Sequence, residues 1–231
     1  MLKAVIFDID GTLIDSVDLH AESWVRALAH FGVRARLDDV RGHIGEGADR
    51  LMPAFLPPDT PQSRKQEIED YRSKLFQREY LGKVRPFPKV RELFELIKRD
   101  GRKLVLASSC TADEITQYKR IAGIGDMVDC QTTSDDARRS KPAPDIFVKA
   151  VQSLSPIGCE DCVVVGDSRY DGEAALKAGI AFVAVLCGGS SEPELKQAGA
   201  VAIYKDPEDL LLNWNTWKHL PSCQGLSAAA S

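Results

Sequence analysis

The chain has 231 residues, of which 28% are charged, and its formal net charge at pH 7 is −4. This length suits one large domain, or a domain with an insert, and leaves room for a substantial core. Charges of both signs are interspersed, so the chain has no basic surface of the kind that nucleic acid or an anionic membrane requires, and we expect neither as a partner.

Hydropathy and cysteine usage favour a cytoplasmic protein. The apolar runs are too short to cross a bilayer, and the first predicted strand begins at Ala4, which leaves no room for a signal peptide. The six cysteines are scattered along the chain, as is typical of reduced thiols. Cys159 and Cys162 form a C-x-x-C pair without a second pair at zinc-like spacing, which favours structural thiols.

The first strand carries the most informative residues. Ala4 to Phe7 are continuously apolar, which predicts a strand buried on both faces of a parallel sheet. Asp8 and Asp10 follow it, and because side chains at i and i+2 of a strand share a face, both carboxylates leave its carboxyl end together. Open α/β sheets bind ligands at that edge. Two adjacent carboxylates in a crevice repel each other and need a compensating cation, while Gly11 permits a tight turn over the site.

Residues 16–85 carry only helical patterns, a stretch far longer than a crossover connection needs. The first helix is expected to begin after Asp15 or Ser16 and to close at Gly32. A break at Ile44 to Gly47 precedes the third helix, which is expected to end at Pro53. The expected helices cover residues 17–31, 37–42, 48–53 and 61–80. We interpret this block as an all-helical cap domain inserted after the first strand.

Strand and helix patterns alternate again from Arg85 to Pro88, a stiff segment that returns the chain from the cap. The expected strands cover residues 103–107, 128–132, 162–165, 181–186 and 201–204. The helices between them are expected at residues 90–97, from the capping box of Thr111 and Glu114, and at 144–153, 170–178 and 193–198. Repeated βα units with apolar strands predict a doubly wound α/β fold with a parallel sheet. Its core domain would comprise residues 1–15 and 86–217, with a flexible tail over 218–231.

Two further signals are expected at the carboxyl edge of the sheet. Ser108 and Ser109 precede a helix, where a hydroxyl and backbone N–H groups suit a phosphate. Lys141 precedes a proline that keeps it extended, and it would neutralise a phosphoryl group there. Taken alone, a strand-ending serine is typical of a turn and a single lysine of a solvated surface.

A second acidic pair follows the predicted strand at residues 162–165. Asp167 would complete an oxygen shell for Mg²⁺, which favours few carboxylates, retained waters and substrate phosphate. Asp171 is either part of this site or the cap of the next helix. With Asp8 and Asp10, these residues predict a magnesium site.

Together these segments resemble, in order, the motifs of the haloacid dehalogenase-like superfamily. The matching segments are Asp8-Ile9-Asp10-Gly11-Thr12, Ser108, Lys141 and Gly166-Asp167 with Asp171. The resemblance covers nearly the whole chain to about Leu212. It is to the phosphatase branch with a helical cap after the first strand, in which the chain looks like phosphoglycolate phosphatases and β-phosphoglucomutases. The resemblance implies a Mg²⁺-dependent phosphatase that hydrolyses a small phosphorylated metabolite.

The resemblance also implies a role for each matched residue. Asp8 would be the nucleophile that forms an aspartyl-phosphate, and Asp10 would protonate the leaving oxygen and then deprotonate the attacking water. Mg²⁺ would be held by the Asp8 carboxylate, the Asp10 backbone carbonyl and Asp167, with Asp171 supporting through bound water. The phosphoryl group would be gripped by Ser108 and Lys141, helped by backbone N–H groups near Gly11 and Ser109.

Three alternatives stand beside this interpretation. A haloacid dehalogenase lacks an acid at the position of Asp10, which argues against that activity. A sugar phosphomutase like β-phosphoglucomutase is favoured by His20 and Trp24, but those enzymes have a Glu-Asp pair where this chain has Gly166-Asp167-Ser168. A non-catalytic binding protein is the third, since the fold alone does not prove activity.

The cap is expected to select the group attached to the phosphate. The candidate contacts are His20 and a loop that can approach the core closely at its glycines, namely Gly45, Glu46, Gly47 and Arg50. Glu46 would repel a carboxylate such as that of phosphoglycolate, unless it is a solvated charge or the partner of Arg41 or Arg50. The sequence is compatible with a monomer or a homodimer.

Overall fold

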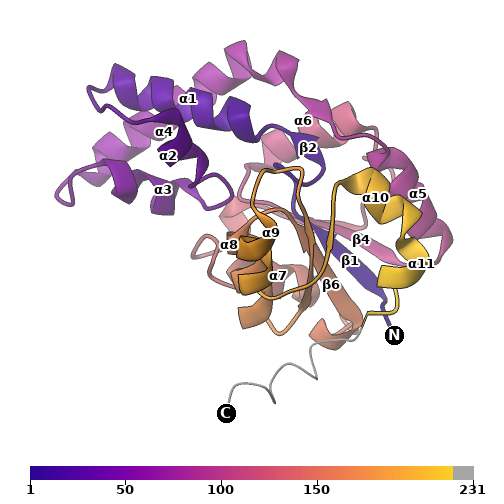
Figure 1. Cartoon of the computed structure of the whole chain (residues 1–231). Helices are drawn as coiled ribbons and strands as arrows, with labels where there is room; N and C mark the ends of the chain where they lie inside the picture. Colours follow the sequence, from indigo (N-terminus) through magenta and orange to yellow (C-terminus); the bar gives the residue numbers. More distant parts are fainter. Residues whose placement is uncertain (221–231) are drawn as a thin grey trace.

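The computed structural model describes residues 1–220, so residues 221–231 of the expected tail lie outside the described part. Its centre is a six-stranded sheet in the order β5-β4-β1-β6-β7-β8, in which all neighbouring strands are parallel (Figure 1). The strands are β1 Ala4–Phe7, β4 Lys103–Ala107, β5 Cys130–Thr132, β6 Cys162–Gly166, β7 Ala181–Val185 and β8 Ala200–Tyr204. This confirms the predicted doubly wound α/β fold.

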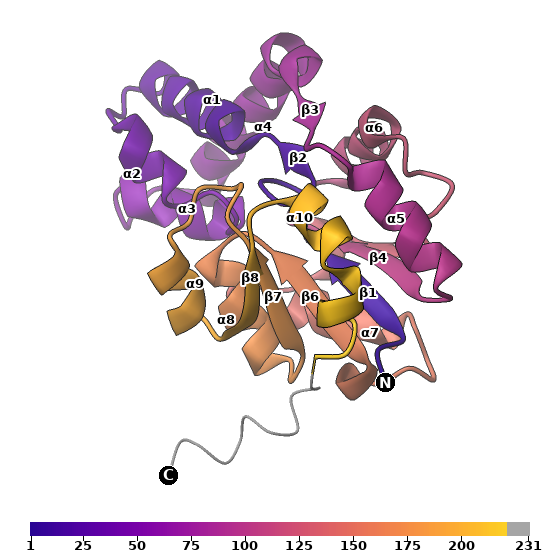
Figure 2. The same cartoon turned by 45° about the vertical axis from the view of Figure 1, so that its right-hand side comes forward.

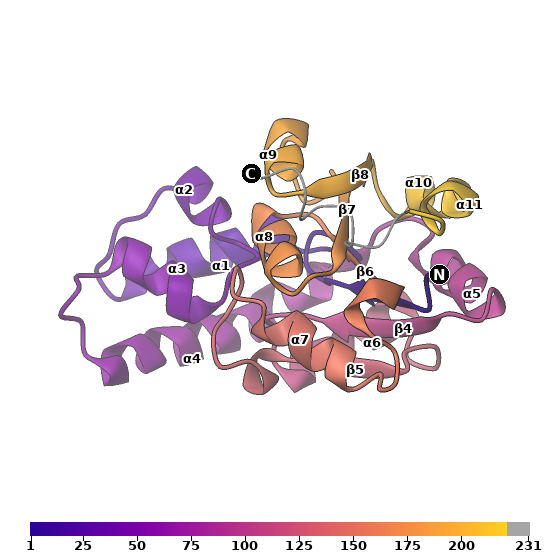
Figure 3. The same ribbon diagram turned by 90° about the horizontal axis from the view of Figure 1, so that it is seen from below.

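Helices cover both faces of the sheet (Figures 2 and 3). One face, which includes Val5 and Phe7, packs against α5 Val90–Arg99, α6 Ala112–Ala122, α10 Pro207–Leu212 and α11 Trp214–Trp217. The other face, which includes Ala4 and Ile6, packs against α7 Asp145–Gln152, α8 Arg169–Lys177 and α9 Glu192–Gln197. Strand β1 is therefore fully buried on both sides, as its continuous apolar run predicts.

Four helices gather at one end of the molecule, on the side of the carboxyl ends of the strands (Figure 1). They are α1 Val17–His30, α2 Leu37–Arg41, α3 Ala48–Phe55 and α4 Gln62–Glu79. They enclose an apolar core of their own around Trp24, Leu28 and Leu51. The chain enters and leaves this helical unit through an antiparallel pair of short strands, β2 Ile14–Asp15 and β3 Arg85–Pro86. These two crossings therefore lie side by side.

One expectation about secondary structure is wrong, and two helices were not expected. Helix α3 does not end at Pro53 but continues to Phe55, because a proline in a helix removes only one backbone donor and the bond from Leu56 N to Met52 O still forms. Helices α10 and α11 were not expected, and they fix the buried Trp214 and Trp217 beside α5. In the described part of the chain, every helix is too short or too polar to traverse a lipid bilayer.

Candidate active site

Three buried carboxylates meet at the point where the strand order reverses about β1 and β6. Asp8 follows β1, Asp167 follows β6, and Asp171 lies in the first turn of α8. One oxygen of each lies within 4.8 Å of the others. Lys141 Nζ lies 2.5 Å from Asp8 Oδ1 and 2.7 Å from Asp171 Oδ1. A single ammonium group thus faces three carboxylates in a buried site.

The electrostatics of this cluster favour a divalent cation. Burial raises the pKa of Asp8 to about 7, with the charge of Asp171 adding to the rise and Lys141 opposing it. Burial, then the charges of Asp171 and Asp8, raise the pKa of Asp167 well above its usual range. Asp171 Oδ1 is close to Lys141 but receives no well-oriented hydrogen bond. Uncompensated negative charge and buried carboxylate oxygens are what a Mg²⁺ ion requires.

Because the three carboxylates of the cluster are crowded, replacing one of them should stabilise the metal-free protein, and the size of this effect should depend on pH. Because the folded state raises the Asp8 pKa, the associated stability is present at low pH and is lost as the pH rises toward about 7. In chelator, Asp8→Asn is expected to raise the free energy of unfolding by about 2 kcal/mol at pH 8 and by much less at pH 5. Urea unfolding at the two pH values measures this difference, and an equal effect at both would contradict it.

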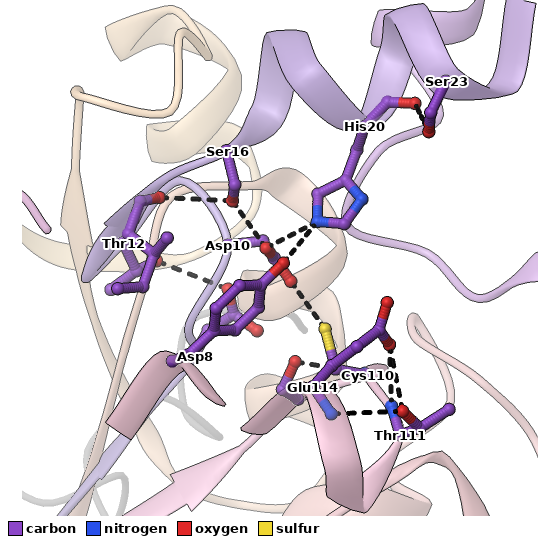
Figure 4. Close-up of polar contacts among 12 residues, drawn as sticks. Asp8, Asp10, Thr12, Ser16, His20, Ser23, Cys110, Thr111 and Glu114 are labelled. Carbon is purple, nitrogen blue, oxygen red and sulfur yellow. Dashed lines mark hydrogen bonds and ion pairs between the residues drawn. The ribbon is translucent and has the colours of Figure 1, made fainter. Parts of the chain in front are cut away.

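Asp10 is held by three donors at the junction of core and cap (Figure 4). Its Oδ1 lies 2.5 Å from Ser16 Oγ and 2.9 Å from His20 Nε2, and its Oδ2 lies 2.8 Å from Cys110 Sγ. Burial alone would raise the Asp10 pKa, but the charge of His20 and the hydrogen bonds from His20, Cys110 and Ser16 outweigh it and lower the pKa. These contacts therefore keep the carboxylate ionised.

The same contacts change the role expected for two residues. Ser16 begins α1 but does not cap it through its side chain, since its hydroxyl donates to Asp10 instead. His20 was expected to contact the substrate, yet its Nε2 faces Asp10 and the Tyr118 hydroxyl, 3.0 Å away. Its other ring nitrogen contacts Arg72 of α4. His20 therefore positions Asp10 in this structure.

The remaining core residues lie where their strands place them. Ser108, at the end of β4 beside β1, is buried, and its Oγ accepts the Cys110 N–H at 3.2 Å. Ser109 is half-buried next to it. Gly11 has a φ of +81°, and a Cβ at this position would overlap the Asp167 carboxylate. The backbone can therefore fold over the site only at a glycine.

Asp171 caps the next helix, one of the two alternatives that its sequence position left open, and it also lies in the carboxylate cluster. Its Oδ2 accepts the Ser168 hydroxyl at 2.6 Å and the Ser168 N–H at 3.1 Å, which closes a capping box at the start of α8. Its Oδ1 faces Lys141. Asp171 thus orients Lys141 while its second oxygen is occupied by the helix cap.

The loop between α2 and α3 lies against the core, although its charged residues do not reach the carboxylate cluster. A Cβ at Gly45 would lie 3.1 Å from Ser168 Oγ, and one at Gly47 would overlap the Ser140 hydroxyl. Glu46 is nearly buried and pairs with His43, with Arg50 at 4.0 Å. Arg50 is largely exposed, and Arg41 pairs with Asp18 rather than with Glu46.

This arrangement defines an α/β protein with a doubly wound sheet and a buried acidic site at the reversal of strand order. Residues 5–185 match the family model described as haloacid dehalogenase-like hydrolase. The match covers more than half of the chain, so the chain belongs to this family and is one of its hydrolases.

Individual relatives agree with this assignment. The chain is 31% identical to a phosphorylated carbohydrates phosphatase of Thermotoga maritima, over 91% of this chain and 97% of that protein. It is 26% identical to a phosphoglycolate phosphatase of Aquifex aeolicus, over 81% of this chain and 86% of the relative. Among solved structures, a hydrolase from Pseudomonas syringae superposes with a TM-score of 0.86 at 26% identity, covering 92% of this chain and 98% of its own.

Proposed function

We propose that this protein is a Mg²⁺-dependent phosphatase that hydrolyses a small phosphate monoester through an aspartyl-phosphate on Asp8. The observation that carries the proposal is the buried cluster of Asp8, Asp167 and Asp171 around Lys141, with the ionised Asp10 beside it. Relatives with phosphatase names support it. The sequence Gly166-Asp167-Ser168 favours hydrolysis over the phosphomutase alternative.

The residues of the cluster would hold both the cation and the phosphate beside the nucleophile. Asp8 and Asp167 carboxylates and the Asp10 backbone carbonyl would hold Mg²⁺, which when bound neutralises charge on the phosphoryl oxygens. Lys141 and Ser108 would bind the equatorial oxygens. Thr12 Oγ1 donates to Asp167 Oδ1 at 2.8 Å and fixes that carboxylate.

Two displacements then complete the reaction. In the first, an Asp8 oxygen forms a bond to phosphorus as the ester P–O bond breaks, and the leaving oxygen takes a proton from Asp10. In the second, Asp10 takes a proton from water as the water oxygen attacks phosphorus, which releases phosphate and restores the Asp8 carboxylate. The contacts of Asp10 keep it ionised, which is the state in which the second step begins.

Metal dependence tests the proposal directly. We expect a generic aryl phosphate to be hydrolysed in the presence of Mg²⁺ and not in excess chelator. Ca²⁺ should support only slow hydrolysis, because its larger coordination shell misplaces the attacking carboxylate. Phosphate release is measured after exhaustive dialysis and re-addition of each cation. Full activity in excess chelator would contradict the phosphatase assignment and favour the dehalogenase alternative. A panel of sugar phosphates and phosphoglycolate then identifies the preferred ester.

We propose that the loop at residues 44–50 selects the leaving group. Glu46→Gln and Arg50→Ala are expected to change the ranking of natural phosphate esters, because they alter charge in the loop that lies on the core. Hydrolysis of a small aryl phosphate should stay within about tenfold of wild type, or about 1.4 kcal/mol in transition-state stabilisation. Ratios of kcat/KM across the panel measure this. Loss of all activity in well-folded protein would instead place one of these residues in the chemistry.

A further inference from the structure

Two consecutive glycines after β7 lie between the helical cap and Asp167. A Cβ at Gly188 would overlap Asp167 Oδ2 and Cγ, and it would lie 2.7 Å from Asp167 Cβ. A Cβ at Gly189 would overlap the Arg41 guanidinium. The backbone here thus touches the carboxylate on one side and a cap side chain on the other. Neither glycine lies in a segment that matches the family's motifs.

Arg41 joins this backbone to the cap. Its Nη2 donates to the Gly188 carbonyl at 3.1 Å, and its Nε donates to Asp18 Oδ1 on α1 at 2.6 Å. The next residue of the chain, Gly42, accepts a hydrogen bond from the Tyr170 hydroxyl at 2.8 Å. The end of α2 therefore contacts two core segments, at Tyr170 and at Gly188, which line the same cleft as Asp167.

We propose that Gly188 is a positioning residue for the divalent cation, and that Arg41 fixes Gly188 against Asp167 when the cap is docked. The inference rests on the proposed function in that it takes the acidic cluster to be a Mg²⁺ site. Mg²⁺ demands nearly ideal octahedral geometry, so a small displacement of one carboxylate lowers affinity. The Asp167 carboxylate is flanked closely by Gly188 and Gly11 and accepts a hydrogen bond from the Thr12 hydroxyl, and these contacts restrain it to one place.

Adding one methyl group, as in Gly188→Ala, tests the contact between Gly188 and Asp167. Gly188 lies outside the left-handed region, so alanine is compatible with its backbone, and the cost comes from the overlap with Asp167. Asp167 and Gly188 also line an open cleft of about 340 Å³. The carboxylate therefore has space into which it can be displaced while the fold persists.

The experiment compares Mg²⁺ binding by Gly188→Ala with that of wild type and of Gly82→Ala, where a Cβ meets open space. Isothermal titration with MgCl₂ is expected to show at least tenfold weaker binding for Gly188→Ala and unchanged binding for Gly82→Ala. Circular dichroism confirms that each variant is folded. Wild-type affinity in folded Gly188→Ala overturns the inference and leaves the proposed function intact, whereas no Mg²⁺ binding by wild type overturns both the metal dependence and the inference.

If Gly188→Ala does not fold, Arg41→Lys provides a second test of the contact between the cap and Gly188. A lysine keeps the positive charge but lacks the fork that reaches Asp18 and Gly188 together. Its Mg²⁺ affinity is expected to fall about threefold, with a smaller loss for Asp18→Asn, which leaves the bond to Gly188 in place. Unchanged affinity in Arg41→Lys would overturn the part of the inference that links the cap to Asp167.

Discussion

Asp8→Asn is expected to lower the hydrolysis of phosphate esters by at least about 10⁴-fold, or more than about 5 kcal/mol in transition-state stabilisation. An amide oxygen is too weak a nucleophile to attack phosphorus, and without the covalent intermediate the reaction returns to one difficult step. The fold should persist, because the substitution removes one of three crowded carboxylates and leaves Lys141 its contact with Asp171. Release of phosphate from an aryl ester with Mg²⁺ measures the effect.

The matched control is Asp59→Asn, which changes an exposed carboxylate in the loop before α4 and should leave the rate unchanged. Mass spectrometry of acid-quenched wild-type enzyme should find the trapped phosphoryl group on a peptide that contains Asp8. A label on Ser108 or Ser109 would show that the nucleophile is misassigned.

The fold followed from the sequence where local and tertiary preferences agree. The unbroken apolar run of β1 is fully buried on both faces, and the capping box of Thr111 and Glu114 forms at α6 as expected. The final helices were missed because they are short and lack apolar periodicity. Asp206 does cap α10, with Pro207 at its first position. An aspartate followed by a proline is typical of a helix start, so this pair is the signal in the sequence that indicates α10.

The arrangement of the site was predictable only in part. Asp8, Ser108 and Asp167 converge because β1, β4 and β6 are adjacent parallel strands whose carboxyl ends share an edge. The sequence predicts this convergence, because each of these residues directly follows a recognisable apolar strand. The partners of Asp10 do not appear in that way, because Cys110, which contacts Asp10, and Tyr118, which contacts His20, are each about one hundred residues from their partners in the sequence. Contacts between elements that are distant in sequence leave no local pattern.

Asp10→Asn is expected to lower turnover by about 10²- to 10⁴-fold, because it removes a general acid and base while keeping the shape of the side chain. The two steps should respond differently. An aryl phosphate with a good leaving group needs little help from an acid, so Asp8 should still become phosphorylated. Hydrolysis of the intermediate needs the base, so phosphoenzyme should accumulate as a burst of one phenolate per enzyme.

The leaving group therefore provides the internal control for Asp10. Alkyl phosphates, whose leaving oxygen needs a proton, should lose the first step as well, and Asp10→Asn should show no burst with them. The carboxylate normally accepts hydrogen bonds on both oxygens, from Ser16 and His20 on one and from Cys110 on the other. An amide nitrogen cannot accept these hydrogen bonds, so Asp10→Asn loses contacts as well as the base. Cys110→Ala removes one donor and keeps the carboxylate, so its loss of turnover should be far smaller. Equal losses in the two variants, with no phosphoenzyme in either, would mean that the geometry around Asp10, and not its proton, controls the rate.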